Sequence, residues 1–131
     1  MSLRILILLT LLSAYAPLHA ALSPEDLKKL PPATIEAALP NEHPSVYYGY
    51  AARLFREEKK DEAVFWFYVG QLRYRFQRRT RTWIRAVTLR CSLSATVGKT
   101  INEYAGGNVK DWVKAIDRAL KWDADAERIH V

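Results

Sequence analysis

Apolar residues recur at helical spacing through the centre of the chain. Residues 45–56 place five of them on one face, in the i, i+3, i+4 pattern of an amphipathic helix: Tyr47, Tyr50, Ala51, Leu54 and Phe55. A charged turn follows at 57–60, and a second helix then carries apolar residues on nearly every side as far as Phe76. A helix that is apolar all round has to be buried among others. The pattern therefore predicts a helical hairpin in the core of the protein.

The second helix of this hairpin carries two apolar stripes. One stripe is Ala63, Phe67, Gly70 and Tyr74, and the other is Phe65, Val69, Leu72 and Phe76. Asp61 is a suitable cap for this helix, since its side chain can accept hydrogen bonds from free backbone N–H groups. Glycine inside a helix costs about 1 kcal/mol relative to alanine. We therefore expect Gly70 to let another helix approach closely.

Two further long helices are predicted downstream. The first spans about 82–104, with its apolar stripe at Trp83, Val87, Cys91, Ser94, Val97 or Gly98, and Ile101. Gly106-Gly107 is a strong stop signal. Asn108 can cap the next helix, with Asp111 three residues later. The buried face of that helix is predicted to hold Trp112, Ile116 and Ala119 or Leu120. Residues 123–131 are predicted to be a polar tail that frays.

Residues 21–44 are predicted to form an arm of short helices. Ser23 caps the first, with Asp26 at the capping-box position, and Pro31-Pro32 ends it. A second short helix at 33–39 is closed by Pro40. The arm can pack onto the main body through Leu27, Leu30, Ile35 and Leu39. With no segment of sustained period-two alternation, the expected fold is all-α: a compact bundle of four main helices over 45–122 with an N-terminal arm of short helices.

Residues 1–20 have the features of a secretory signal peptide. Arg4 supplies the positive region, an apolar run follows from Ile5 to Leu12, and small residues lead to a cleavage site expected after Ala20. The run is shorter than the roughly 20 apolar residues that span a bilayer, which favours a cleaved signal over a retained anchor. We therefore expect residues 21–131 to be exported as a single α-helical domain, with the periplasm as the expected compartment.

A single cysteine, Cys91, rules out an internal disulfide, so stability is expected to come from packing. Cys91 falls on the apolar stripe of its helix, which favours a core position, because unpaired cysteine is among the most buried residue types. Arg90 beside it leaves a reactive thiol as the alternative. The formal net charge is +6, so an anionic partner is the natural expectation.

The hairpin resembles a tetratricopeptide-type or Sel1-type helical repeat. The matching positions are Tyr47, Tyr50, Ala51 and Leu54 in the first helix, and Ala63, Phe67 and Gly70 in the second. Arg75 stands where the repeat has a proline, and the chain carries one clear copy. The segments AVFWFYVGQLRYR and VGKTINEYAGG are also similar to those of small exported bacterial proteins. The repeat resemblance implies a scaffold that binds other proteins.

Seven arginines occur within eighteen residues that contain no acid: Arg73, Arg75, Arg78, Arg79, Arg81, Arg85 and Arg90. Such a run is either a solvated surface or a docking surface for an anionic partner. Arginine is enriched in interaction hot spots and pairs well with carboxylates and phosphates. Mutual repulsion among these charges favours docking. The predicted partner-binding residues are Arg73, Arg75, Arg78, Arg79 and Trp83.

No catalytic or metal-binding signature occurs in the sequence. The acids Glu57, Glu58, Asp61 and Glu62 lie in a charged turn beside two lysines and are read as caps and surface charge, not as an acid–base pair. Val97-Gly98-Lys99-Thr100 is not a phosphate loop, because Leu93 replaces the required glycine. After signal removal, His43 and His130 are the only histidines. We predict no enzyme activity, no cofactor and no metal.

The function predicted from the sequence is that of an exported, non-enzymatic protein-binding domain. A concrete form is a periplasmic immunity protein that neutralises an antibacterial toxin by covering its active site. The alternatives are an envelope adaptor, a lipid- or glycan-binding module, and, less favoured, a small hydrolase. The expected partner is a protein with an acidic surface. An anionic membrane surface and a second copy of the chain are open alternatives, and export disfavours nucleic acid.

Overall fold

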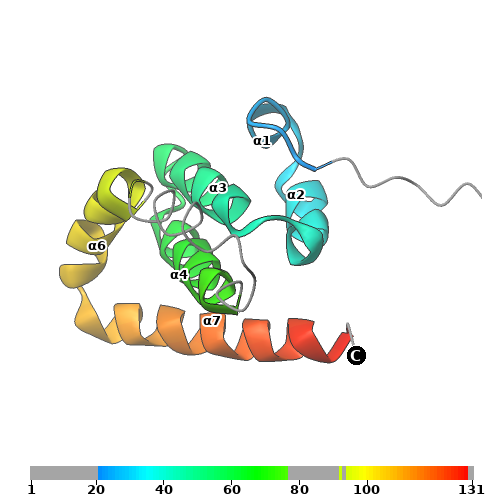
Figure 1. The fold of residues 1–131 in the computed structure, drawn as a ribbon. Coiled ribbons are helices and arrows are strands. Elements are labelled where there is room, and N and C mark those ends of the chain that lie inside the picture. The colour runs from blue at the N-terminus through cyan, green and yellow to red at the C-terminus, as the bar shows by residue number, and fades with distance from the viewer. Residues whose placement is uncertain (1–20, 77–91, 93, 130–131) are drawn as a thin grey trace, which may run out of the picture.

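The computed structural model describes residues 21–76, 92 and 94–129, shown in colour in Figure 1. The described residues are helical, with no β-strand among them, and this confirms the all-α prediction. In chain order the elements are α1 (Asp26–Lys29), α2 (Pro32–Ala38), the 3₁₀-helix η1 (Leu39–Asn41), α3 (Pro44–Arg56), α4 (Lys60–Phe76), the π-helix η3 (Ser94–Gly98), α6 (Lys99–Gly106) and α7 (Val109–Ile129).

The N-terminal arm packs on α3, as predicted. Ser23 and Asp26 exchange hydrogen bonds, from Ser23 N to Asp26 Oδ2 at 2.9 Å and from Asp26 N to Ser23 Oγ at 3.2 Å. The Arg53 guanidinium donates from α3 to the carbonyls of Leu27 and Leu30 at 2.8 and 2.7 Å, satisfying acceptors at the end of α1. Leu27, Ile35 and Leu39, three of the predicted anchors, are buried.

The α3–α4 hairpin forms the centre of the bundle, and its turn is tighter than the sequence predicts. Glu58 adopts a left-handed conformation, with φ of 62°, and the Ala63 N–H already bonds the Lys59 carbonyl at 3.0 Å. Lys59 therefore occupies the cap position. The predicted cap at Asp61 is wrong, because this residue lies within the first turn of α4.

Gly70 allows α3 to approach α4 closely, which confirms its predicted role. A Cβ atom at this position would lie 2.9 Å from Tyr47 Cβ and 3.0 Å from the Tyr48 ring. A real Cβ does not tolerate such a contact with backbone-proximal atoms, so the residue at this crossing has to be glycine unless the helices separate.

An aromatic cluster joins α3, α4 and α7. Trp66 of α4 lies 6.1 Å from Tyr47 of α3 and 5.4 Å from Trp122 of α7, and Tyr47 is 6.1 Å from Trp122, all between ring centroids. Edge-on and tilted geometries at these distances are favourable for aromatic rings. The three helices therefore share one core rather than stacking as separate pairs. Figure 1 shows α7 running along one side of the hairpin.

The C-terminal third has the helix boundary predicted at residues 106–108, but it does not have the predicted polar tail. α6 ends at Gly106, and Asn108 accepts a hydrogen bond from Asp111 N at 3.3 Å, as a cap should. The predicted polar tail at 123–131 is wrong over the described residues, because α7 continues to Ile129. The helix continues because Asp123 and Ala126, each 5% exposed, are buried on its inner side. On the predicted buried face of α7, Ala119 is buried, but the prediction is wrong for Leu120, which is 49% exposed because the inner side of the helix is the one that carries the alanines.

The predicted helix over 82–104 is described only from residue 92, and Cys91 lies outside the described residues. Where the chain is described again, it passes through η3 before α6 begins. Gly98 at the end of η3 sits against Phe67 of α4, where an added Cβ would lie 2.7 Å from the ring. Ile101 on α6 is buried, as its predicted stripe position requires. None of the described helices is long and apolar enough to cross a membrane.

Candidate functional site

The predicted partner-binding residues lie at and beyond the C-terminal end of α4. Arg73 and Arg75 occupy its last turn, whereas Arg78, Arg79 and Trp83 lie outside the described residues. Arg75 is exposed, as a docking residue needs to be. Each residue along a helix is rotated by about 100° from the one before it. Arg73 and Arg75 are two positions apart, so their side chains leave nearly opposite sides of α4.

Arg73 points inward, toward α7. Its Nε atom lies 3.0 Å from Asp123 Oδ1, as an ion pair without the alignment of a hydrogen bond, and the two side chains are 16% and 8% exposed. The Arg73 guanidinium also lies 5.3 Å from the centroid of the Trp122 ring, within the range of a cation–π contact. Arg73 thus contributes to the joint between α4 and α7, and its part in partner binding stays a prediction.

The acids of the α3–α4 turn do not form a common site. Glu57 pairs with Arg53 at 2.7 Å, Glu58 with Lys60 at 2.9 Å, and Glu62 with Arg118 of α7 at 3.2 Å. The hydrogen bond from Arg53 holds the pKa of the Glu57 carboxyl below its ordinary value. A general acid needs the opposite shift. The arrangement agrees with the interpretation of these residues as surface charge.

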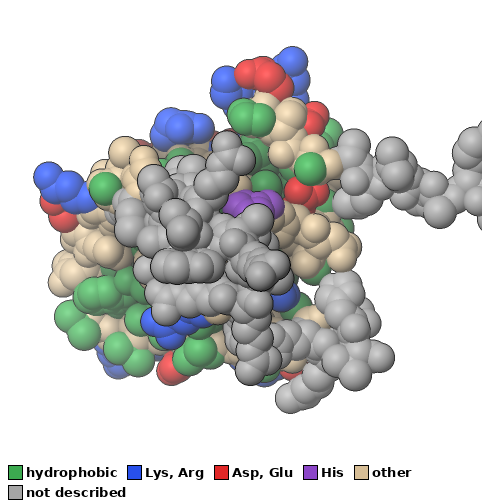
Figure 2. Space-filling view, in the orientation of Figure 1, with side chains coloured by type: hydrophobic (Ala, Val, Ile, Leu, Met, Phe, Trp, Pro, Cys, Tyr) green, Lys and Arg blue, Asp and Glu red, His purple; other side chains and the backbone are tan. Residues whose placement is uncertain are grey.

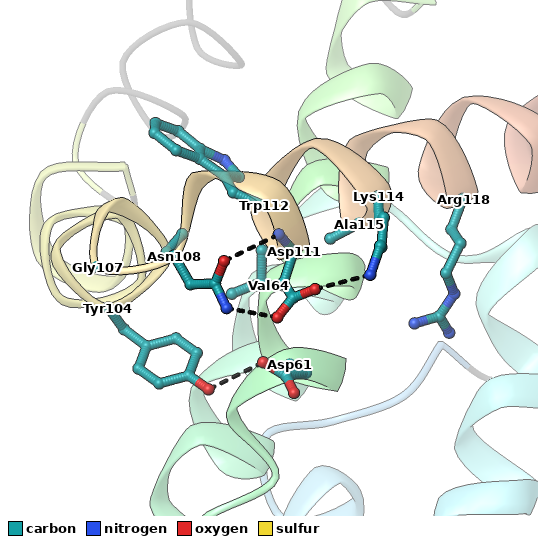
Figure 3. A pocket seen from close by; sticks show the side chains of 11 residues that line it. Asp61, Val64, Tyr104, Gly107, Asn108, Asp111, Trp112, Lys114, Ala115 and Arg118 are labelled. Atoms are coloured by element: carbon teal, nitrogen blue, oxygen red, sulfur yellow. Dashed lines mark hydrogen bonds and ion pairs between the residues drawn. The ribbon is translucent and has the colours of Figure 1, made fainter.

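A pocket of about 530 Å³ lies where the first turns of α4 and α7 meet the end of α6 (Figure 3). Figure 3 shows Tyr104 and Asp61 facing each other on one side, and Lys114 and Arg118 on the other. Tyr104 Oη donates to Asp61 Oδ1 at 2.8 Å, and this bond raises the pKa of the Tyr104 hydroxyl. No pattern in the sequence indicates this pocket.

The charged groups around the pocket already have partners within the chain. Lys114 bonds Asp111 at 3.0 Å, and Asn108 Nδ2 also donates to Asp111. The Arg118 guanidinium carbon lies 4.4 Å from the centroid of the Phe65 ring, and the same group bonds Glu62. Acids and bases alternate around the rim, so the pocket has no strong charge of one sign. The rim therefore offers hydrogen-bond donors and acceptors of both charges.

The acids of the described residues are almost all engaged internally. Every carboxylate whose side chain the structure describes, except Asp117, takes a hydrogen bond or an ion pair from a neighbour. By contrast, the exposed cations Arg56, Arg75 and Lys110 have no acid within ion-pair distance among the described residues. The excess positive charge of the chain is therefore not neutralised within this part of the fold.

Within the described part of the chain, no group of three or more histidine, cysteine or acidic side chains comes close enough together to hold a metal ion. His43 serves the fold instead: its Nδ1 accepts a hydrogen bond from Ser45 N at 3.2 Å at the start of α3, and its ring meets Tyr74 edge-on. No protein-family model, curated protein or solved structure matches this chain. The resemblance of the hairpin to a tetratricopeptide-type repeat stays a prediction.

Proposed function

We propose that this chain is an exported, non-enzymatic domain that binds an acidic face of another protein. The observation that carries the proposal is the uneven pairing of charge. Apart from Asp117, the described acids are engaged within the fold, while Arg56 and Arg75 have no acid beside them in the described residues. A partner that supplies carboxylates would meet cations whose charge is uncompensated, which gives favourable association at long range.

The end of α4 is the proposed centre of this contact. Arg75 is exposed in the last turn, and the sequence adds Arg78, Arg79, Arg81 and Arg85 directly after it. Arg73 holds this turn against α7 through Asp123, so the backbone that carries Arg75 is anchored to the bundle. An anchored backbone has less conformational entropy to lose on binding than a mobile one. This supports a specific protein partner over a diffuse charged surface.

The concrete form that we propose is an immunity protein, which covers the active site of an incoming toxin. Its size, the predicted export signal and its cationic segment suit that role. Occlusion needs no catalytic group, and the shared aromatic core packs α3, α4 and α7 into one body that could cover a site.

Capture of proteins by the immobilised mature domain, with and without charge reversal, tests the proposal. The test variant is Arg75→Glu/Arg78→Glu/Arg79→Glu. The matched control is Lys28→Glu/Lys29→Glu/Lys99→Glu, which changes the net charge equally at exposed positions on α1 and α6. We expect a periplasmic or toxin protein to be captured by the wild type and the control but lost by the test variant. Equal capture by all three would rule out the arginine segment as the docking surface.

Binding to lipid is the outcome that would replace this proposal. Vesicles of zwitterionic lipid, with and without anionic phosphatidylglycerol, separate the two cases. If the wild type floats with the anionic vesicles at low salt and no protein is captured, the cationic segment serves a membrane surface instead. Inhibition of the captured protein's activity by the domain would establish the immunity form, and capture without inhibition would favour an adaptor.

A further inference from the structure

The outer side of α7 carries an apolar stripe that the bundle does not cover. Val109, Val113 and Leu120 are 60%, 51% and 49% exposed, and Ile116 between them is half-buried. The core-facing side of the same helix is a different set, Ala115, Ala119 and Ala126. In Figure 2, hydrophobic side chains gather at the lower left, over the junction of α6 and α7. The apolar arc of α7 is therefore wider than the surface that α4 covers.

The spacing of this stripe is that of a coiled-coil seam. The steps from Val109 to Val113, Ile116 and Leu120 are four, three and four residues, as for alternating d and a positions of a heptad. Four such residues on one exposed helix can interlock with a second helix of the same pattern. An isolated exposed valine would need no explanation, but a continuous seam does.

The charges beside the seam identify its occupant. Lys110 and Asp117 follow Val109 and Ile116 directly, so each holds the e position next to the seam. Both are exposed, and neither forms an ion pair with any residue that the structure describes. In an antiparallel pair of helices, e positions face e positions. Lys110 of one copy would then meet Asp117 of the other, and the same contact would form twice.

We infer that α7 is the interface of a two-fold symmetric dimer, in which the seams of two copies pack antiparallel. Val113 of each copy packs against Ile116 of the other, and Val109 against Leu120. A parallel pairing would bring e against g positions, which are Trp112 and Ala119 on the core side, and would leave both charges unmatched. The seam has four residues per copy, so the expected dissociation constant is on the order of 10–100 µM.

Sedimentation equilibrium of the mature domain tests this inference. We expect the wild type to dimerise in that concentration range and Val113→Glu/Leu120→Glu to remain monomeric. Both side chains are exposed, so the variant should keep the helical circular dichroism of the wild type. The control Lys114→Glu/Lys121→Glu changes exposed positions on the polar side of α7 and should still dimerise.

Charge exchange tests the antiparallel arrangement itself. Lys110→Asp alone and Asp117→Lys alone each place like charges opposite one another twice, and should weaken self-association about tenfold at low salt. The double variant Lys110→Asp/Asp117→Lys should recover it. A mixture of the two single variants should form a heterodimer more tightly than either forms a homodimer, because both contacts become attractive.

A wild-type chain that stays monomeric at about 1 mM would overturn the dimer. Single variants that do not recover on mixing would overturn the antiparallel seam. Neither result bears on the arginine segment, because Arg75→Glu/Arg78→Glu/Arg79→Glu leaves α7 unchanged. The dimer and the proposed acidic partner can therefore fail separately.

Discussion

The guanidinium of Arg73 and the carboxylate of Asp123 meet at 3.0 Å between the end of α4 and the C-terminal half of α7, where both side chains are largely buried. The Trp122 ring lies against the same guanidinium at 5.3 Å. A buried ion pair adds little stability relative to apolar residues of the same shape, but removing one member leaves a charge without compensation. The pair therefore ties the end of α4 to the C-terminal half of α7.

We predict that Arg73→Met destabilises the fold by about 3 kcal/mol, because it removes the buried guanidinium that pairs with the Asp123 carboxylate. Urea unfolding followed by circular dichroism measures the loss. The double variant Arg73→Met/Asp123→Leu removes both charges and should cost much less than the sum of the two single changes. Additive costs would mean that the two groups do not interact.

Arg73 also shows where sequence reasoning about the site reaches its limit. The run of arginines identified a cationic segment, and one of its members turned out to pair with Asp123, in a stretch read as a polar tail. An acid near the C-terminus is expected to be solvent-exposed unless a cation from a distant part of the sequence is known to pack against it. Helix periodicity shows on which face of its own helix a residue lies, but it does not show which other helix packs against that face.

The bundle itself was more predictable than the site. Each of α3, α4 and the arm follows from local signals, such as Ser23 with Asp26 and the apolar spacing after Tyr47. The pocket did not follow, because Asp61 and Tyr104 come from helices that are far apart in sequence and meet only through tertiary packing. No local pattern couples a residue in the first turn of α4 to one near the end of α6.

Gly70→Ala should destabilise the protein by about 1–3 kcal/mol, although alanine is the better helix former by about 1 kcal/mol. The added methyl would meet Tyr47 Cβ at 2.9 Å, and α3 would have to move. Gly106→Ala is the matched control, since a Cβ there meets nothing within 4 Å. It should be neutral or slightly stabilising. A stable Gly70→Ala variant would show that the α3–α4 crossing can separate without cost.

Buried tyrosines are expected to limit stability at alkaline pH. Burial raises the pKa of the Tyr47 and Tyr50 hydroxyls above their ordinary value of 10.0, and the hydrogen bond from Tyr50 to Glu36 adds to the effect at Tyr50. The folded chain keeps these protons where the unfolded chain releases them. Stability is therefore complete below the ordinary pKa and falls as the pH rises beyond about 10, by about 1.4 kcal/mol per pH unit for each tyrosine.

Tyr50→Phe separates this effect from the titration of lysines. It should cost about 1 kcal/mol at neutral pH, through loss of the bond to Glu36. Above a pH of about 10, the free energy of unfolding should fall less steeply than in the wild type, by about 1.4 kcal/mol per pH unit, because one titrating tyrosine is missing. Urea unfolding at a series of pH values measures both. If the slope stays that of the wild type, Tyr50 ionises in the folded state and its burial does not protect it.

The C-terminal half of α7 is expected to be necessary for the fold. Ala126 is 5% exposed on the inner side of α7, whereas Ala124 is exposed. Ala126→Glu would bury a carboxylate in a space that holds a methyl group, so we expect a loss of at least 3 kcal/mol or failure to fold. Ala124→Glu, with the same change of side chain two residues away, should alter stability by less than about 0.5 kcal/mol. Thermal unfolding of dilute samples compares the two, and equal stability would mean that the helix beyond Trp122 frays in solution.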